Sequence, residues 1–500
     1  MRSRAEVLII GGGATGTGIA RDLAMRGAEV MLVEANDFAA GATGANHGML
    51  HSGARYAVTD PMSARECAVE GNILKRIARF CIEDTGGLFV SARDDDEEYV
   101  DRFLPACQEA GIGAREISVD AAREIEPGLD PGIKAAVEVP DASIDPFFLT
   151  LGNVASARAH GAVVMNHAPV RSIRRSGGRF EAMIGGKRKI TADVVVNAAG
   201  SWAGEMAAML GASIPMCVDK GTMVVFNGRL VGRLVNRLRP PSDGDILVPH
   251  RTATILGTTS SAGAPGAPAT SAEVERLIDQ AAAVFPSIRT ARAVRAYAGT
   301  RPLIGLGSAG RKVTRTFQVI DHSSDGVDGL ISVTGGKLTT YRLMAEKASD
   351  AVMEKLGRAA ARCRTADEEI APFDDAPSDL FDEEAMRYRL GKKENISLMP
   401  ACGCEAVSRG ELDLQTSSPD VVDLGDLMRR TRAGMGYCQA GLCAVSMASA
   451  MGMGTRELRH YLGERWKGVE PVLYGEQLRQ EAFKAHLMKA YGIDHTEASK

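Results

Sequence analysis

Residues 7–16, with the sequence VLIIGGGATG, decide the fold of this chain. An apolar run leads into Gly11, Gly13 and Gly16 in the order G-x-G-x-x-G, the helix-like segment GTGIARDLAMRG follows, and EVMLVE predicts a second strand that ends on Glu34. In such a βαβ unit Gly11 permits the tight turn, Gly13 admits a pyrophosphate to the backbone and Gly16 lets the helix pack against the strand. Glu34 lies where an acid accepts hydrogen bonds from a nucleotide ribose. The sequence therefore predicts a dinucleotide site in a Rossmann-like α/β domain.

Length and composition indicate a soluble chain of several domains. Its 500 residues are 45% hydrophobic and 24% charged, as in ordinary globular proteins, and the length suggests about three domains. A net charge of -4 gives no indication of nucleic-acid binding, and no apolar stretch approaches the roughly 18 residues that span a bilayer. The first expected strand starts at residue 7, so we expect no signal peptide before it. We expect a cytoplasmic protein that reaches a membrane only through a partner or an amphipathic face.

Later segments add helices, strands and a second nucleotide contact. Apolar spacing and N-capping residues predict helices over residues 62–80, 95–110, 118–125, 145–160 and 271–285. Residues 193–210 repeat the strand, small-residue turn and helix of the N-terminus, which makes Ala199, Gly200 and Trp202 candidates for a second approach to the nucleotide. Residues 214–260 are rich in expected strands and predict a β-rich domain inserted into the first.

Four stretches carry a resemblance to a known family. They are the N-terminal fingerprint and the segments GATGANHGMLHSGARYAV, YAGTRPL and GGKLTTYR. Together they resemble the FAD-dependent glycerol-3-phosphate dehydrogenases of the D-amino-acid-oxidase-like superfamily, over roughly residues 5–357. The resemblance implies that FAD is the cofactor. The residues expected to bind it are Gly11, Gly13, Gly16, Glu34, Thr43, Asn46, Val170, Ala199, Gly200, Gly335, Gly336, Lys337, Leu338 and Thr339.

Nine cysteines in an expected cytoplasmic chain are poor disulfide candidates, and four of them cluster near the C-terminus. Cys402 and Cys404 form C-x-C, and Cys438 and Cys443 form C-x4-C after 33 intervening residues. Four thiolates suffice for a [2Fe-2S] cluster or for tetrahedral zinc. Because zinc knuckles favour C-x2-C pairs, we favour iron, and the segment resembles the [2Fe-2S] domain of bacterioferritin-associated ferredoxin. We interpret the other cysteines as small apolar core residues: Cys67, Cys81, Cys107, Cys217 and Cys363.

The expected fold class is therefore mixed α/β and α+β: a Rossmann-like FAD-binding domain of the D-amino-acid-oxidase type, an inserted β-rich substrate domain and a small helical [2Fe-2S] domain. The FAD-binding parts are expected at about residues 1–85, 146–213 and 315–357, and the substrate domain at about 86–145 and 214–314. The acidic, weakly apolar residues 358–384 predict a linker. The cysteine domain is expected at 385–455 and a helical tail at 456–500.

The resemblance assigns the catalytic site to His51, Arg55, Arg301 and Lys337, each in or beside a glycine-rich loop. Arginine forks bind phosphate oxygens bidentately, although any single arginine can equally form a surface salt bridge. His51 is the candidate general base, although a lone histidine is more often structural. Some respiratory relatives carry a further histidine in a region where this chain has Asn236 and, at its end, His250, so the identity of the base stays open.

The expected reaction oxidises sn-glycerol 3-phosphate to dihydroxyacetone phosphate, with electrons passing through FAD and a [2Fe-2S] cluster to partner subunits and quinone. The resemblance implies a hetero-oligomer in which one partner carries a second flavin or another redox group. A further iron–sulfur partner is expected to anchor the assembly to the inner face of the cell membrane. Two alternatives stay open: a related 2-hydroxyacid or amino-acid dehydrogenase, and a non-catalytic iron–sulfur electron carrier.

Overall fold

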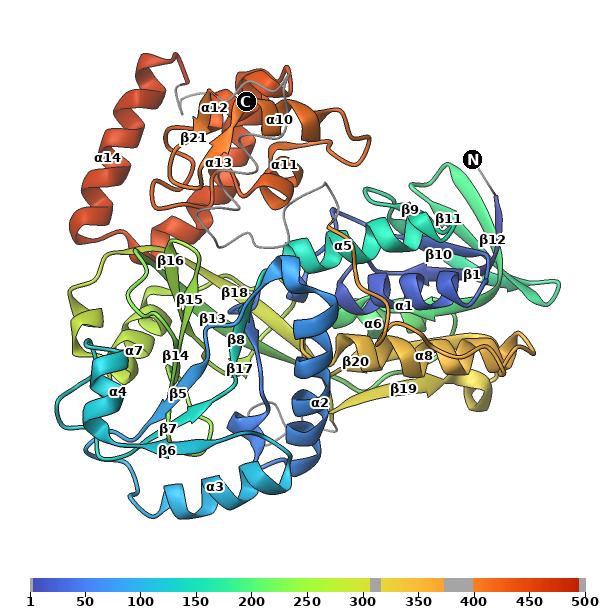
Figure 1. Cartoon of the computed structure of the whole chain (residues 1–500). Coiled ribbons are helices and arrows are strands. Elements are labelled where there is room, and N and C mark those ends of the chain that lie inside the picture. Colours follow the sequence, from blue (N-terminus) through green and yellow to red (C-terminus); the bar gives the residue numbers. More distant parts are fainter. Residues whose placement is uncertain (1–2, 306–315, 373–398, 494–500) are drawn as a thin grey trace.

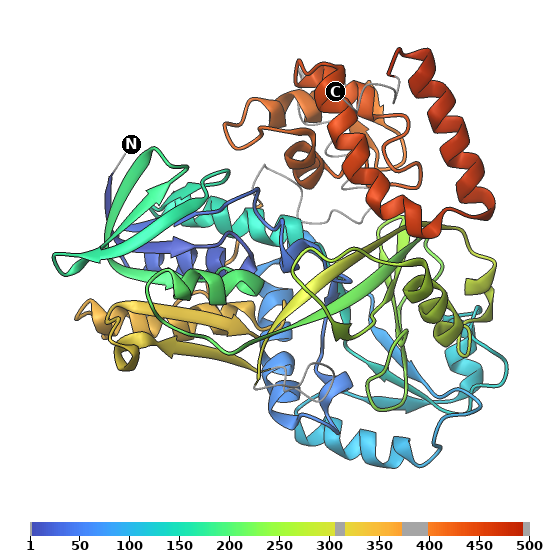
Figure 2. The ribbon, with the colours of Figure 1, turned by 180° about the vertical axis from the view of Figure 1, so that it is seen from behind.

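The computed structural model describes residues 3–305, 316–372 and 399–493 (Figure 1). Two sheets divide the N-terminal part of the chain into two lobes, and the C-terminal helices lie across both of them in the front and back views (Figures 1 and 2). None of the described helices is both long and apolar enough to cross a membrane.

An eight-stranded sheet forms the first lobe and is built around β1. The order is β10-β11-β12-β1-β2-β9, with β20 paired to β12 and β19 to β20, and β1 runs parallel to both β2 and β12. The bounds are β1 (Arg4–Ile10), β2 (Val30–Val33), β9 (Val163–Met165), β10 (Val170–Ser176), β11 (Arg179–Ile184), β12 (Arg188–Asn197), β19 (Phe317–Asp321) and β20 (Leu330–Gly335). The predicted βαβ unit is thus at the centre of this sheet.

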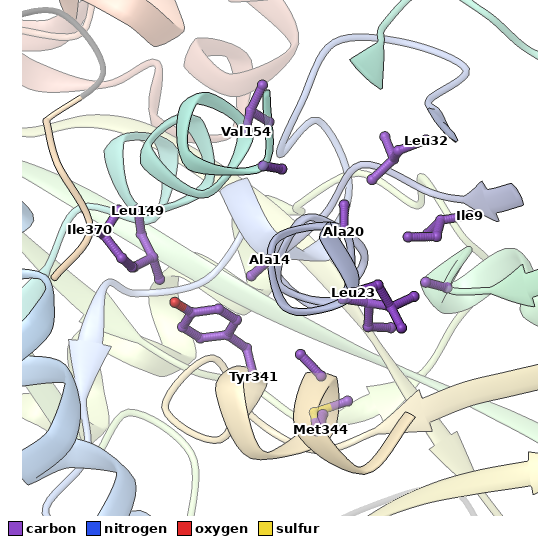
Figure 3. Close-up of a cluster of buried hydrophobic side chains, with 14 of the residues drawn as sticks. Ile9, Ala14, Ala20, Leu23, Leu32, Leu149, Val154, Tyr341, Met344 and Ile370 are labelled. Atoms are coloured by element: carbon purple, nitrogen blue, oxygen red, sulfur yellow. The ribbon is translucent and has the colours of Figure 1, made fainter. Parts of the chain in front are cut away.

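Three helices cover one face of this sheet: α1 (Ala14–Met25), α5 (Pro146–Ala159) and α8 (Tyr341–Lys355). Side chains alternate along β1, so Val7 and Ile9 pack against these helices while Leu8 and Ile10 pack on the opposite face, which α6 (Ala203–Ala208) covers. Figure 3 shows the Tyr341 ring of α8 directed toward Leu149 of α5, with Ala14 of α1 nearby. This packing fixes the N-terminus of α1 at the carboxyl end of β1.

A nine-stranded sheet forms the second lobe, in the order β17-β13-β16-β15-β14-β5-β7-β6 with β18 on the free edge of β13. Its strands are β5 (Gly87–Val90), β6 (Arg115–Ile117), β7 (Ala136–Val139), β13 (Met216–Asn227), β14 (Leu234–Arg237), β15 (Ile246–His250), β16 (Ala253–Gly257), β17 (Ser261–Ala262) and β18 (Ala293–Ile304). The helices of this lobe are α3 (Tyr99–Glu109), α4 (Val119–Ile125) and α7 (Ser271–Ala281). The β-rich insertion in a mixed α/β fold is confirmed.

Helix α2 (Pro61–Ile77) and a small sheet of β3 (Met49–Leu50), β4 (Ile82–Glu83) and β8 (Ala142–Ile144) join the two lobes. Helix α3 begins four residues later than the sequence predicts. The reason is that Asp95 accepts a hydrogen bond from the Ala92 N–H and pairs with Arg237, which holds its segment in a turn.

Within residues 399–493, a two-stranded sheet and five α-helices pack around one apolar core. The elements are β21 (Pro400–Cys402), β22 (Val407–Ser408), α10 (Arg409–Thr416), α11 (Leu424–Thr431), α12 (Ala444–Ala450), α13 (Thr455–Val469) and α14 (Gly475–Ala490). Leu458 of α13 and Met488 of α14 share this core with Cys402 and Cys443, so the segment predicted as a separate tail packs with the cysteine segment.

Part of the predicted linker also has a fixed place. Ile370 is buried in the core of the first lobe and its N–H bonds to the Ile77 carbonyl, and buried Arg21 donates to the Thr365 and Glu368 carbonyls. The rest of that linker, and the predicted start of the cysteine domain at residue 385, lie outside the described residues.

Candidate active site

A cavity of about 1330 Å³ lies where the two lobes meet. This volume exceeds the ~300–1,000 Å³ of an ordinary small-molecule site, so the cavity has room for a dinucleotide and a substrate. Of the residues predicted to bind cofactor or substrate, those that line it are Gly11, Gly13, Glu34, Thr43, Asn46, His51, Arg55, Val170, Ala199, Gly200, Arg301, Gly335, Gly336, Lys337 and Leu338. Gly16 and Thr339 lie outside the lining, and each supports a residue that belongs to it.

The glycine turn at the end of β1 is closed on one side and open on the other. Gly11 has a φ of +116°, and a Cβ there would lie 2.3 Å from the Ala198 carbonyl oxygen, while a Cβ on Gly16 would lie 2.0 Å from the Gly11 oxygen. A Cβ on Gly13 would meet only Thr43, at 3.0 Å. Gly13 is also the N-cap of α1 and has no side chain to cover the helix start, where the Ala14 N–H donates to the Thr43 hydroxyl at 3.0 Å. The turn therefore leaves the start of α1 accessible to a phosphate from the cavity, as a pyrophosphate site requires.

Glu34 reaches the same turn from the end of β2. Its Oε2 accepts a hydrogen bond from the Gly12 N–H at 2.6 Å, and its Oε1 accepts one from the Asn36 N–H at 2.8 Å. Each carboxylate oxygen has a second lone pair, so Glu34 can still accept bonds from a ribose. These geometric features fit FAD.

Two histidines and a tyrosine cluster in the cavity wall. The His51 ring lies 5.6 Å from the His47 ring and 5.4 Å from the Tyr56 ring, and its N–H backbone group donates to the Thr339 hydroxyl. The His51 side chain is buried, and its Nδ1 has no hydrogen-bond partner. Sequence reasoning missed His47, although its spacing of four residues from His51 in the same loop was visible.

Both histidines are neutral at pH 7. Burial, Arg301 and Arg55 lower the pKa of His47 to about 3. Burial, followed by His47, Arg55 and Lys337, lowers the pKa of His51 well below its usual range. A neutral His51 ring has one nitrogen free to accept a proton, and the shifts also show that this end of the cavity has a positive potential.

Arg55 is held at one end of its guanidinium and has an unused donor at the other. Its Nη2 pairs with Asp245 at 2.9 Å and donates to the Ser242 carbonyl at 3.2 Å, whereas its buried Nη1 has no partner. Asp245 also pairs with Arg239 at 2.8 Å, so one carboxylate is shared by two guanidinium groups. A buried cationic donor without a partner is costly, and a small movement of the Arg55 side chain, which lines the cavity, would bring it to an anion there.

The other two predicted cations stand on different elements. Arg301, on β18, pairs with Asp219 of β13 and donates to the Thr258 hydroxyl and the Thr259 carbonyl. Lys337 follows β20, and its ammonium group lies 4.6 Å from the centre of the Tyr56 ring. The fold thus brings Arg55, Arg301 and Lys337 to one cavity from three parts of the chain.

Asn236 and His250, which the sequence analysis named in connection with the catalytic base, do not line this cavity. Asn236 is buried in β14, with its Nδ2 3.5 Å from an Asp141 oxygen. His250 is directed to Arg432 of the C-terminal part, with 3.1 Å between His250 Nε2 and Arg432 Nη1. Among the described residues, His47 and His51 are the histidines of the cavity wall.

The four clustered cysteines converge in space. The sulfur of Cys404 lies 3.8 Å from that of Cys402 and 3.9 Å from that of Cys438, and Cys443 interacts with both Cys402 and Cys438. A Cβ on Gly436 would lie 2.5 Å from the Cys404 sulfur, so the loop needs a glycine there. The predicted ligand set is therefore one compact group. The other five cysteines are separate from it, and Cys67, Cys81 and Cys107 are buried.

The protein favours the thiolate form at two of these positions. The neighbouring thiols, followed by the Gly434 and Glu405 N–H groups, lower the pKa of Cys402 to about 3. The thiols of Cys404 and Cys443, followed by the Leu442 and Gly441 N–H groups, lower the pKa of Cys438 to about 2. The thiolates of Cys402 and Cys438 in turn raise the pKa of Cys404 and Cys443. Backbone N–H groups directed at sulfur, in a group of four thiols, fit a metal centre.

Known proteins match both the lobes and the whole chain. The family model described as FAD dependent oxidoreductase matches residues 6–342. One subunit of the anaerobic glycerol-3-phosphate dehydrogenase of Escherichia coli (strain K12) is 42% identical, over 96% of this chain and 95% of that protein. The corresponding subunit of the same enzyme in Haloferax volcanii is 40% identical, over 99% and 92%. This chain belongs to that subunit family of anaerobic glycerol-3-phosphate dehydrogenases, which are FAD-dependent oxidoreductases.

A solved structure agrees with this family at the level of fold. The FAD complex of glycerol-3-phosphate dehydrogenase from Bacillus halodurans has a TM-score of 0.65 with this chain at 22% identity, and covers 95% of this chain and 97% of that one. The predicted D-amino-acid-oxidase type of fold and the FAD cofactor are confirmed. The cavity with the glycine turn and Glu34 is the place in this family member that fits FAD.

Proposed function

We propose that this chain oxidises sn-glycerol 3-phosphate to dihydroxyacetone phosphate and passes the electrons through a [2Fe-2S] cluster to partner subunits and quinone. The observation that supports the substrate is the convergence of Arg55, Arg301 and Lys337 in the wall of one cavity, where the Arg55 Nη1 donor also has no hydrogen-bond partner. A phosphate carries about two negative charges, and Arg55, Arg301 and Lys337, which after burial also lower the pKa of His47 or His51, stabilise such an anion.

The residues of this chain bind the substrate phosphate and remove the hydroxyl proton. Arg55, Arg301 and Lys337 hold the phosphate and so fix the carbinol carbon in the cavity. His51 takes the hydroxyl proton, since its neutral ring lines the cavity and its Nδ1 has no other hydrogen-bond partner. FAD, when bound, supplies the acceptor for the hydride that leaves this carbon.

Cys402, Cys404, Cys438 and Cys443 hold the proposed cluster, because four thiols in one group match the ligand number of a [2Fe-2S] centre. The acceptor subunits are proposed from the relatives, whose name marks each of them as part of a larger enzyme. We infer that this chain reaches the inner face of the cell membrane through such subunits.

The direct test is an absorption spectrum of the anaerobically purified protein before and after addition of glycerol 3-phosphate. We expect the flavin bands to bleach with glycerol 3-phosphate and to persist with glycerol, 2-hydroxyacids and amino acids. Bleaching by a 2-hydroxyacid or an amino acid, and not by glycerol 3-phosphate, would contradict the proposed substrate. If none of these compounds bleached the flavin, the result would favour the alternative of a non-catalytic electron carrier.

Replacing Arg55 with alanine tests the phosphate contact. We expect Arg55→Ala to raise the KM for glycerol 3-phosphate by about ten- to a hundredfold, since a charged hydrogen bond contributes roughly 1.5–3 kcal/mol and 1.4 kcal/mol is tenfold. FAD content should stay at the parent level. The measurement is steady-state kinetics with a soluble dye, and the control is Arg174→Ala, which removes an exposed arginine of the β10–β11 hairpin. An unchanged KM would show that Arg55 does not bind the phosphate.

A further inference from the structure

The end of α11 carries three arginines that contact the first lobe. This segment, residues 429–432 with the sequence RRTR, comes six residues before Cys438. Arg430 makes a double ion pair with Asp37, at 2.7 and 2.9 Å, and Arg429 approaches the same carboxylate at 3.3 Å. Asp37 follows Glu34 in the loop after β2, so the contact lies beside the expected ribose end of the cofactor site.

Arg432 makes the second and more central contact. It ends α11 with a φ of +66° and is 5% exposed. Its Nη1 lies 2.7 Å from Asp145 Oδ2 and 3.1 Å from His250 Nε2, and its Nε lies 3.0 Å from Glu405 Oε2. One buried guanidinium thus joins both lobes to the cysteine segment.

The partners of Arg432 lead toward both redox sites. Asp145 follows Ile144, whose N–H donates to the Gly48 carbonyl at 2.8 Å, and the neighbours of Gly48 line the cavity. On the other side, Glu405 directly follows Cys404. A continuous series of bonds therefore runs from the cavity wall through Asp145, Arg432 and Glu405 to a sulfur of the proposed cluster.

We propose that Arg432 is a positioning residue that fixes the cysteine cluster relative to the flavin cavity and so sets the rate of electron transfer between them. This inference rests on the proposed function, because it needs both the flavin reaction and the [2Fe-2S] centre. The Arg430–Asp37 pair is equally buried and lies at the ribose end of the cofactor site, but Arg432 differs from it in bonding to Glu405, the residue next to Cys404. The pair of Arg158 with Asp420 is more exposed.

The electron transfer in question balances as follows. Oxidation of the substrate leaves two electrons on the flavin, and a [2Fe-2S] cluster accepts one at a time. In each transfer the flavin loses one electron and the cluster gains one. The second electron follows after a one-electron acceptor outside the chain has reoxidised the cluster.

The variant that tests this is Asp145→Asn. Asp145 is the N-cap of α5, where its Oδ1 accepts from the Phe147 and Phe148 N–H groups, and asparagine caps helices as well as aspartate does. The change removes the negative charge from the first lobe and leaves Arg432 paired with Glu405. The matched control is Asp420→Asn, which removes the charge from the exposed pair with Arg158.

We expect Asp145→Asn to keep the parent contents of FAD and iron and to be bleached by glycerol 3-phosphate at the parent rate. Reduction of the cluster, followed by freeze-quench electron paramagnetic resonance, should be at least about tenfold slower, since losing one partner of a buried ion pair shifts an equilibrium by more than one order of magnitude. Asp420→Asn should resemble the parent in both reactions.

A second readout needs no turnover. Amide hydrogen exchange of residues 432–438 should be faster in Asp145→Asn than in the parent, because Arg432 loses its bond to the first lobe while the Arg430–Asp37 pair still holds the C-terminal part there. Equal cluster reduction rates in Asp145→Asn and the parent would overturn the inference, and so would slower flavin bleaching. A parent protein without iron, or one that glycerol 3-phosphate does not bleach, would instead overturn the proposed function. If Asp145→Asn loses iron, Arg432→Lys decides, because lysine keeps the positive charge but lacks the forked donors that bond both Asp145 and Glu405. Slower cluster reduction with parent-like iron and flavin bleaching in Arg432→Lys supports the inference, and parent-like cluster reduction contradicts it.

Discussion

A Gly13→Val variant should purify as a folded protein that contains almost no FAD. The added Cβ would meet the Thr43 hydroxyl at 3.0 Å, a tight contact that a movement of Thr43 by a few tenths of an ångström relieves. The branched side chain would instead occupy the start of α1, where the pyrophosphate must approach the backbone. We expect FAD content, measured by absorbance after release of the flavin, to fall to less than about a tenth of the parent value, since one blocked phosphate contact costs more than 1.4 kcal/mol.

The matched control is Gly463→Val. Gly463 is exposed on α13, and a Cβ there meets nothing within 4 Å. This variant should bind FAD as the parent does. Far-ultraviolet circular dichroism should be alike in the parent and both variants, which separates loss of cofactor from loss of fold. Normal FAD content in Gly13→Val would contradict the place assigned to the pyrophosphate.

The features of this chain that the sequence predicts well are those with a local cause. The glycine turn, α1 and Glu34 follow one another within 28 residues, so residue types and spacing alone define them. The cysteine pairs are also recognisable, because each pair is a short motif. The predicted helix over residues 145–160 agrees with α5 for the same reason, since Asp145 and Pro146 mark its start.

The features that sequence reasoning missed depend on contacts between distant residues. Arg55 and Asp245 are 190 residues apart, and Arg432 and Asp145 are 287 residues apart, so no local pattern links them. The acidic composition of residues 358–384 predicts a linker, yet Ile370 packs into the core of the first lobe. A single apolar residue in a charged stretch has no periodic signal, and only the tertiary structure shows where it lies.

A Cys438→Ser variant should lose about two irons per chain and keep its FAD, because a [2Fe-2S] cluster needs four thiolates and the serine leaves three. Cys438 is the position with the most strongly lowered thiol pKa, to about 2, and its sulfur lies 3.9 Å from that of Cys404. Glycerol 3-phosphate should still bleach the flavin, since the cavity that holds the substrate contains none of the four cysteines. Electron delivery to the partner subunits should fall below about a tenth of the parent rate, because the two electrons then have no one-electron centre through which to leave.

The same preparation separates the chemistry from the electron path. A soluble two-electron dye that reaches the flavin directly should be reduced by Cys438→Ser at close to the parent rate, while the assembled enzyme should no longer reduce quinone. The matched control is Cys217→Ser, a half-buried cysteine of β13 outside the group, which should keep its iron and both activities. Elemental analysis decides between the two metals that four thiolates can hold. If the parent contains zinc instead of iron, or if Cys438→Ser delivers electrons to its partners at the parent rate, then the C-terminal part has a structural role, and electrons leave the flavin by another route.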